Sequence, residues 1–392
     1  MTTSTRSTQS TQAFITGVYD TAVGELPGSS CMSLHAEAAL GAVADAGLTL
    51  EDIDGVLCAY SFTEPHLMLS SVFCEYMGIN PRVSQALQCG GATACILLMQ
   101  AMALVQSGQC RHVLVVCGDN RMTGMSRDAA VAALAEVGHP QFERPYGISV
   151  PASYGLVAQH YLHHTGSTQE HLAAIAVQTR QHAMRNPKAQ RREPITIADV
   201  LASRPIAEPL RVMDCCLISD GGAAVVVSAA APARDTRKTP IAMLGAGQGH
   251  THEHVFAAPS LIDFGCKRSS QLAFEQAGVT AADIDVAEIY DSFTITLLIE
   301  LESIGFFERG EAGPAVLAGA LDLTGRLPCN THGGLLSYAH SGAAGGLFHA
   351  VEAVRQLRGE AEARQVHEPR LAFVHGDGGI LSAHCSLVLG RI

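Results

Sequence analysis

An internal repeat constrains the fold of this 392-residue chain more than any other feature. The segment Ala46–Asp54 (AGLTLEDID) recurs as Ala277–Asp285 (AGVTAADID). In both copies an alanine-rich stretch leads to a glycine, which favours a helix end, and then to a threonine that can begin a short turn. A run of strand-forming residues follows each copy, at 56–60 and at 286–290. The repeat therefore predicts two similar α/β units.

A second pair of segments repeats in the same order. Gly91-Ala-Thr-Ala and Gly342-Ala-Ala-Gly each begin an apolar helix that ends at a glycine seventeen residues later. Each helix leads to an apolar strand that ends in Gly-Asp, at 113–119 and at 371–377. Apolar runs without alternation are typical of central strands that are covered on both faces.

Together the repeats predict an α/β fold made of two copies of one unit. The first copy takes residues 12–120 and a return segment at 205–235, and the second takes 240–392. Residues 121–204 are predicted to form an inserted loop domain, rich in His, Arg and Pro.

Charge and composition exclude several classes of function. Lys and Arg number 25 against 37 Asp and Glu, a net charge of −12, which disfavours binding to nucleic acid. The twelve cysteines lie inside apolar runs without the spacing of a disulfide framework. The polar N-terminal tail is unlike a signal peptide, and no apolar run is long enough to span a bilayer. We expect a cytoplasmic protein with reduced thiols and no membrane partner.

A short basic stretch in the insertion has two interpretations. It holds five of the 25 basic residues: Arg180, Arg185, Lys188, Arg191 and Arg192. Such a run can simply be a solvated surface. It can also bind the phosphates of coenzyme A, because arginine binds phosphate through two parallel hydrogen bonds. The sequence leaves both interpretations open.

Three motifs, taken together, resemble the thiolase superfamily, and in particular the sterol-carrier-protein-type thiolases and their relatives. They are 214–224 (DCCLISDGGAA), 288–293 (EIYDSF) and 333–345 (GGLLSYAHSGAAG). The resemblance covers nearly the whole chain. It implies a duplicated, five-layered αβαβα thiolase fold, a homodimer, and an active site at the N-termini of the two equivalent helices. Unpaired N–H groups at such helix ends can stabilise an oxyanion.

The nucleophile of cysteine-dependent thiolases is missing from its expected place. By the family's spacing that cysteine falls on Gly91, whereas Cys89 lies two residues too early. Cys89 is either an acyl-accepting thiolate activated by the helix dipole or a small buried residue. The gap-free pairing of Gly91 with Gly342 favours the second interpretation.

Other family positions are also changed. Tyr290 stands in place of the motif histidine, Ser292 in place of a cysteine base, and His375 near a C-terminal cysteine. The thiolase-like aldolases of steroid side-chain degradation also lack the nucleophile and have a tyrosine at the position of Tyr290. They carry a second tyrosine where this chain has His340. His340-Ser341 resembles instead the His-x-Ser of the thiolase-like subunit in phloroglucinol acyltransferases.

These residues suggest roles in an aldol cleavage beside a thioester. His340 is the expected base, near its working pKa at neutral pH, and Tyr290 is the expected proton donor. The thioester oxygen is expected to be held by four further residues: Gly91, Ser341, Gly378 and Gly379. The resemblance also implies a small partner protein with a zinc ribbon and an OB fold.

Three functions remain open from the sequence. The favoured one is a nucleophile-free retro-aldol cleavage of a β-hydroxyacyl-CoA, with the coenzyme A thioester as substrate and no covalently bound cofactor. The second is an acetyl-CoA acyltransferase that uses Cys89. The third is a non-catalytic subunit that binds acyl-CoA. We expect no metal ligands, because the one histidine-rich run, 250–254 (HTHEH), has no partnering cysteine or carboxylate pair.

Overall fold

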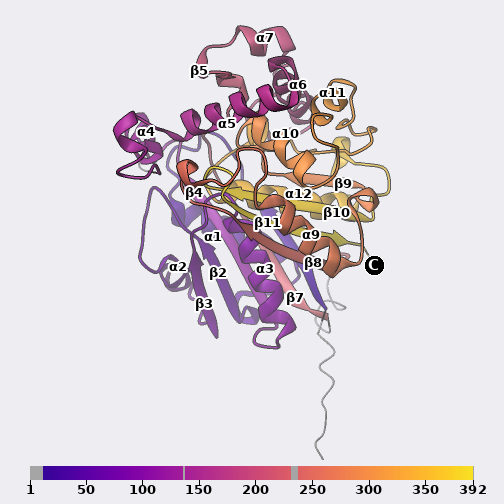
Figure 1. Cartoon of the computed structure of the whole chain (residues 1–392). Helices are drawn as coiled ribbons and strands as arrows, with labels where there is room; N and C mark the ends of the chain where they lie inside the picture. The colour runs from indigo at the N-terminus through magenta and orange to yellow at the C-terminus, as the bar shows by residue number, and fades with distance from the viewer. Residues whose placement is uncertain (1–11, 136, 231–236, 392) are drawn as a thin grey trace, which may run out of the picture.

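A nine-stranded mixed sheet forms the centre of the molecule (Figure 1). The computed structural model describes residues 12–135, 137–230 and 237–391. The strand order is β3-β2-β4-β7-β1-β8-β11-β10-β9. These strands are β1 (Ala13–Asp20), β2 (Gly55–Ala59), β3 (Val83–Leu87), β4 (His112–Asn120), β7 (Asp220–Ala229), β8 (Ile241–His250), β9 (Val286–Ile289), β10 (Leu371–Gly378) and β11 (Ala383–Gly390).

The sheet confirms the predicted duplication. Reading outward from the centre, β1-β7-β4-β2 in the first copy matches β8-β11-β10-β9 in the second. In each copy the inner pairs are antiparallel and the pair β4/β2 or β10/β9 is parallel, and the first copy adds β3 parallel to β2. The copies join where β1 and β8 pair in antiparallel fashion through Phe14–Ala242 and Ile15–Ile241.

Helices separate and cover the two copies of the sheet. They are α1 (Cys31–Asp45), α2 (Leu69–Met77), α3 (Thr93–Gln106), α9 (Cys266–Ala277), α10 (Thr294–Ser303), α11 (Ala312–Leu317) and α12 (Ala344–Arg358). Helices α3 and α12 contact each other and strands of both copies, so they form the middle layer. Helix α1 packs on β1, β4 and β7, whereas α9 packs on β8 and β11. The result is the predicted αβαβα order.

Local structure at the repeat is also the same in both copies. The backbone N–H and hydroxyl of Thr49 donate to the Asp52 carboxylate at 2.8 and 2.9 Å. Thr280 and Asp283 make the same two bonds at 2.8 and 2.7 Å. Each pair begins a 3₁₀ turn that enters the parallel strand, so the sequence repeat corresponds to a shared connection between helix and strand.

The segment between β4 and β7 is mostly helical. It contains α4 (Arg127–Ala135), α5 (Val150–Thr165), α6 (Gln169–Ala183) and α7 (Ile197–Ala202), with the short pair β5 (Pro205–Ala207) and β6 (Leu210–Arg211). In Figure 1 these elements lie above the sheet. Helix α6 packs on α10 and α11, which places the insertion against the second copy. Among the described residues, no helix is both long and apolar enough to cross a membrane.

Candidate active site

A cavity of about 700 Å³ lies where α3 and α12 begin. Its wall takes residues from both copies of the unit and from the insertion, which closes one side through Val137, Val150 and Tyr154. The polar residues in the wall come mainly from the second copy and from the segment before β7. Those that matter most below are Tyr290, His340, Asp377, Cys216 and Arg121.

Tyr290, His340 and Cys216 form one hydrogen-bonded chain along this wall. The Tyr290 hydroxyl lies 3.0 Å from Nε2 of His340, and Nδ1 of His340 lies 3.2 Å from Sγ of Cys216. Tyr290 follows β9 directly, and His340 lies between a π-helical turn (Gly334–Tyr338) and α12. The structure thus brings together the two residues to which the sequence assigned acid–base roles.

Burial keeps the side chains of Tyr290, His340 and Cys216 in their neutral forms. Desolvation, with the nearby charge of Arg121, lowers the pKa of His340 to about 3. Desolvation also holds the pKa of Tyr290 well above its usual value, and raises the pKa of Cys216 to about 12. The expectation that His340 has a pKa near neutrality is therefore wrong, because the sequence could not show how deeply the ring is buried. His340 acts here as a neutral hydrogen-bond acceptor for the Tyr290 phenol.

The side chain of Tyr290 fills the space that a residue at Gly91 would need. A Cβ atom built on Gly91 would overlap the end of the Tyr290 ring and the carbonyl oxygen of Asp377. The phenol of Tyr290, from the other copy, thus occupies the space that a side chain would need at position 91, where the family spacing predicts the nucleophile. Both Gly91 and Tyr290 line the cavity.

Cys89 also lines the cavity but is not activated. Burial raises the pKa of its thiol, and the nearby charge of Glu253 raises it further. Its backbone N–H donates to the Thr93 hydroxyl at 2.9 Å, which ties the turn to the start of α3. A neutral thiol is a poor nucleophile compared with a thiolate. Because Cys89 lines the cavity, substitution can test whether it accepts an acyl group or only fills space.

The residues expected to hold the thioester oxygen are only partly brought together. Gly91, Gly378 and Gly379 line the cavity, whereas Ser341 does not. Ser341 is fully buried, and its hydroxyl has no hydrogen-bond partner among the described residues. The N-caps of α3 and α12 are alanines, whose side chains cannot cap the helix. In the first turns the backbone N–H of Thr93 donates to the Gly90 carbonyl at 3.2 Å, and that of Gly345 to the Gly342 carbonyl at 3.0 Å.

The basic residues of the insertion lie outside the cavity wall. Lys188 pairs with Asp20 at 2.8 Å, and Arg180 donates to the Ser337 hydroxyl at 2.9 Å. Arg185, just beyond the end of α6, donates to the carbonyl of Gln181 in the last turn of that helix. Neither they nor Arg191 are among the residues that line the cavity. Coenzyme A phosphate binding by this group stays a prediction.

Sequence reasoning missed several polar residues of the wall. Cys216 lies inside the 214–224 motif, so the motif itself was a signal of its proximity to the site. Asp377 is next to Gly378, but its carboxyl accepts from Tyr154 of the insertion at 2.8 Å, a contact that no spacing predicts. Arg121 likewise follows β4 and stacks on Phe62, 4.8 Å from the ring centre.

Family models match almost the whole described chain. The model described as "Thiolase, N-terminal domain" matches residues 13–231, and "Thiolase C-terminal domain-like" matches 247–391. The chain belongs to the thiolase family. Matches to proteins named sterol carrier protein 2 confirm the predicted branch of the superfamily.

Two curated relatives carry different activities in their names. The chain is 36% identical over 363 residues to the 17-hydroxy-3-oxo-4-pregnene-20-carboxyl-CoA lyase of Mycobacterium tuberculosis, covering 89% of this chain and 92% of the lyase. It is 31% identical over 383 residues to the acetyl-CoA acetyltransferase of Methanothermobacter thermautotrophicus, covering 94% and 98%.

A solved structure similar to this chain also carries the name of a carbon–carbon cleaving enzyme. The structure of the "Ltp2-ChsH2(DUF35) aldolase" superimposes with a TM-score of 0.86 at 33% identity, covering 97% of this chain and 98% of that one. The chain is therefore a thiolase-superfamily enzyme for acyl-CoA chemistry, either a carbon–carbon lyase or an acyltransferase.

Proposed function

We propose that this thiolase-family enzyme cleaves a β-hydroxyacyl-CoA by a retro-aldol reaction without a covalent intermediate. The observation that carries the proposal is the Tyr290 phenol, which occupies the space of the missing nucleophile and is hydrogen-bonded to His340. An acyl-enzyme mechanism needs an activated nucleophile, whereas aldol cleavage needs only proton transfers and a stabilised enolate.

The chain Tyr290–His340–Cys216 can carry the proton that such a cleavage releases. The substrate hydroxyl gives its proton to the Tyr290 oxygen while the phenol proton moves transiently to Nε2 of His340, whose low pKa makes the protonated ring a strong acid for the return step. The Cα–Cβ bond breaks, the β-carbon becomes a carbonyl, and the bonding electrons form an enolate at the thioester. The helix N-termini near Gly91 and Gly342 stabilise that charge, and return of the proton to Cα completes the cleavage.

Two alternatives rest on specific features. Cys89 faces the cavity, so an acyltransferase reaction through its thiol is the second candidate. A non-catalytic acyl-CoA-binding subunit is the third, and it has less support, because a wall that carries three coupled polar side chains is more than binding requires.

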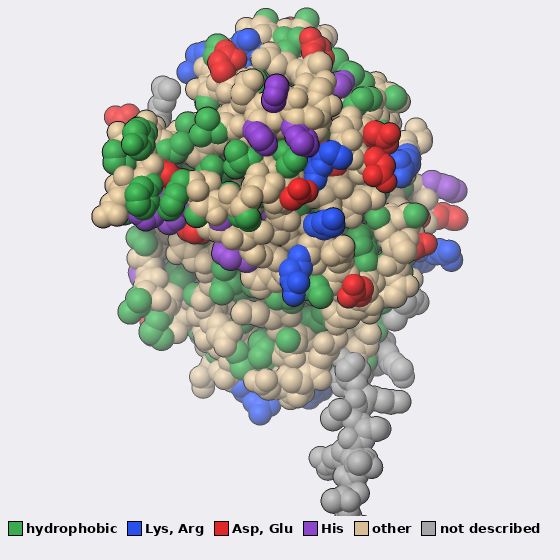
Figure 2. All heavy atoms as spheres, in the orientation of Figure 1, with side chains coloured by type: hydrophobic (Ala, Val, Ile, Leu, Met, Phe, Trp, Pro, Cys, Tyr) green, Lys and Arg blue, Asp and Glu red, His purple; other side chains and the backbone are tan. Residues whose placement is uncertain are grey.

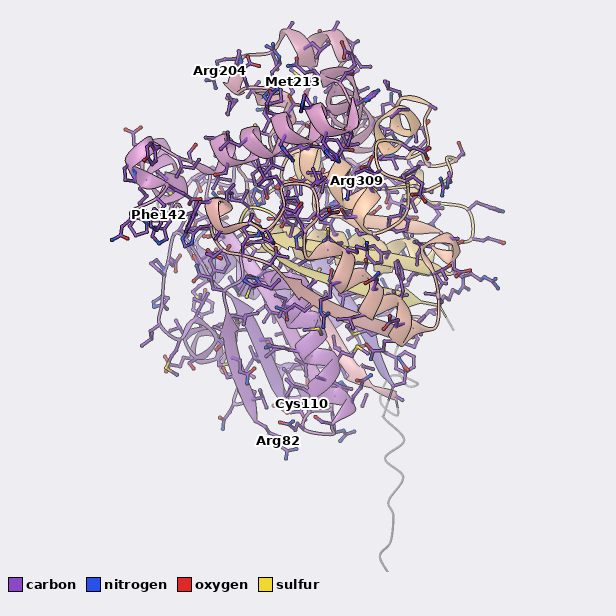
Figure 3. All side chains as sticks on the ribbon, viewed as in Figure 1. Arg82, Cys110, Phe142, Arg204, Met213 and Arg309 are labelled. Atoms are coloured by element: carbon purple, nitrogen blue, oxygen red, sulfur yellow. The ribbon has the colours of Figure 1, made fainter. Side chains whose placement is uncertain are left out.

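The proposed acyl group is bulky and largely apolar. The outer wall of the cavity contains Val137, Val150, Pro151, Leu217, Ile218 and Val255. Beside it, Phe142 and Phe256 have ring centres 5.0 Å apart, and both are more than half exposed. Figure 2 shows hydrophobic side chains gathered over this region near α4, and Figure 3 places Phe142 there. A ring system held in the cavity would cover these exposed side chains.

The test is a cleavage assay combined with intact-protein mass spectrometry. A synthetic β-hydroxyacyl-CoA with a cyclic β-substituent is expected to yield a ketone and a shorter acyl-CoA, with no mass added to the protein. A stable acyl adduct that disappears in Cys89→Ser would support the acyltransferase instead. The turnover of His340→Ala is measured in the presence of any required partner protein. An unchanged value would contradict a catalytic role for the hydrogen-bonded residues Tyr290, His340 and Cys216.

We further propose a cytoplasmic homodimer. Strand β3 is an edge of the sheet with its middle residues exposed, and Leu67 and Met68 lie exposed just before the neighbouring helix α2. Bare strand edges and apolar patches favour association. Sedimentation analysis should show a dimer for the wild type and a monomer for Leu67→Asp/Met68→Asp.

A small zinc-ribbon and OB-fold partner is proposed as well. The support is the superimposed aldolase structure, whose name couples Ltp2 with ChsH2(DUF35). The coenzyme A thioester is the proposed substrate, with no covalently bound cofactor. Co-purification with the product of a neighbouring gene, followed by the cleavage assay with and without it, tests whether the enzyme needs the partner.

A further inference from the structure

A second group of polar residues lies buried beside the cavity and has no part in the chemistry proposed above. Glu300 of α10, His375 of β10 and His384 of β11 are completely buried, and one ligand-type atom of each lies within 4.8 Å of the others. Asp377, two residues after His375, lines the cavity and extends toward the same group.

Glu300 is the unusual member of this group. Neither oxygen of its carboxyl has a hydrogen-bond partner among the described residues, although the side chain is inaccessible to solvent. One oxygen of Asp377 is likewise without a partner there. A buried carboxyl without hydrogen bonds costs several kcal/mol unless a cation or a proton compensates it. Two such groups side by side therefore need an explanation.

A second buried group, Glu288 with His332 and His349, differs in its carboxyl, although ring nitrogens of both histidines lack hydrogen-bond partners among the described residues. Glu288 accepts from the backbone N–H and the hydroxyl of Thr331, at 2.9 and 2.8 Å. Its other oxygen lies 2.9 Å from Nδ1 of His332 and 3.4 Å from Nδ1 of His349. Each oxygen of Glu288 thus has its own donor, whereas Glu300 has none among the described residues.

The distances around Glu300 fit the edges of a coordination polyhedron. Nε2 of His375 lies 3.3 Å from Oε1 of Glu300 and 3.1 Å from Nδ1 of His384. The third edge, from Nδ1 of His384 to Oε1 of Glu300, is 3.7 Å. Ligands on a tetrahedral zinc ion stand about 3.3 to 3.5 Å apart, given bonds of about 2.0 to 2.2 Å. The three atoms therefore enclose a position at bonding distance from each.

The surroundings are those that orient metal ligands. His375 has its second ring nitrogen 2.8 Å from the Ser386 hydroxyl, which in turn lies 2.9 Å from the Ser269 hydroxyl. Asp377 accepts from Tyr154 at 2.8 Å with one oxygen, and its other oxygen lies 3.9 Å from Nδ1 of His384. Outer hydrogen bonds of this kind fix the ring orientation and ligand basicity in metal sites.

We propose that Glu300, His375 and His384 bind a divalent transition-metal ion of the zinc class, with Asp377 facing the fourth coordination position. Two neutral imidazoles and two carboxylates balance the charge of a divalent ion, so the buried group becomes neutral overall. The ion links helix α10 to the β10–β11 hairpin, whose turn supplies Gly378 and Gly379 to the cavity wall. It stabilises that wall, and the inference is independent of the proposed reaction.

The experiment measures metal content in the full-length protein. The chain is produced in medium supplemented with Zn²⁺, freed of surface ions with a chelator and gel filtration, and analysed for all first-row metals by mass spectrometry. We expect one ion per chain in the wild type, because a buried site with these ligands releases its metal slowly once folded. A folded wild-type protein without metal would overturn the proposal.

Matched variants locate the ion. Glu300→Gln and His384→Gln should lose the metal and lower the melting temperature, whereas His332→Gln in the Glu288 group should keep it. Retention of the ion in both Glu300→Gln and His384→Gln would refute the assignment. If these variants do not fold, growth of the wild type with Co²⁺ decides, since four-coordinate Co²⁺ gives strong visible absorption that six-coordinate Co²⁺ does not.

Discussion

The two copies of the repeated unit meet at the cavity with similar backbones and different side chains. Helix α3 begins two residues after Gly91, and α12 begins two residues after Gly342. The first copy supplies Tyr60, Cys89 and, from its return segment, Cys216, whereas the second supplies Tyr290, His340 and Asp377. Duplication has thus preserved the paired helix starts, while the side chains around them differ between the copies.

Removal of the hydroxyl that the second copy contributes should have the largest effect. Tyr290→Phe keeps the ring against Gly91 but cannot pass a proton to His340. We expect kcat/KM for β-hydroxyacyl-CoA cleavage to fall by about 10² to 10⁴, the usual size of an acid–base contribution. Steady-state kinetics beside a thermal melt checks this, and a loss of activity caused only by unfolding would show in the melt.

Adding a methyl group to the paired glycines should distinguish the two helix starts. Gly91→Ala places a Cβ inside the Tyr290 ring, so we expect a loss of about 1–3 kcal/mol in stability and about 100-fold in kcat/KM. At Gly342 the nearest atom is 3.5 Å away, but φ is +67°, so Gly342→Ala costs only about 1–2 kcal/mol of backbone strain. Equal kinetic losses in the two variants would contradict the role of Tyr290 as the neighbour of Gly91.

Acid should destabilise the second copy through His340. The pKa of this residue is about 3 in the folded protein and about 6.5 in the unfolded chain, so the unfolded state binds the proton first as the pH falls. Stability present above pH ~6.5 is therefore lost on acidification, by about 1.4 kcal/mol per pH unit. Denaturant unfolding of wild type and His340→Gln between pH 6 and 4 should show this difference in slope, and parallel slopes would contradict the burial of a neutral imidazole.

The cysteine of the first copy should matter least. Cys89→Ala is expected to change kcat/KM by less than about threefold, or ~0.6 kcal/mol, because burial and the nearby charge of Glu253 keep the thiol neutral. The same cleavage assay measures it. A large loss of kcat/KM in Cys89→Ala, together with an acyl adduct on the wild type, would instead assign Cys89 of the first copy as the nucleophile.

The sequence predicted the architecture because repeats and uninterrupted apolar runs are local signals. The helix starts after Gly91 and Gly342 and the strands that follow them all lie where the repeat placed them. It also identified Tyr290 and His340, since both belong to family motifs. It could not predict their protonation, because the pKa of His340 depends on burial and on Arg121, which is far away in sequence.

Groups assembled by the fold were invisible to motif searches. Glu300 and His375 are 75 residues apart and meet only in the folded chain, where Oε1 of Glu300 lies 3.3 Å from Nε2 of His375. Closely spaced histidines occur instead in the run 250–254, where His252 is buried with its Nε2 at 3.1 Å from the carbonyl of Ile380. Spacing along the chain detects a metal site only when one loop supplies most of the ligands.

The overlap between the Tyr290 ring and the space above Gly91 has an evolutionary consequence. With Tyr290 in place, one substitution cannot install a nucleophile at position 91, because the new side chain would collide with the phenol before it could react. If the tyrosine is lost first, the proposed proton transfer through Tyr290 is lost and no nucleophile replaces it. Loss of the tyrosine and gain of a nucleophile must therefore occur together. The packing of a single ring thus restricts exchange between a mechanism based on Tyr290 and one based on a cysteine at position 91.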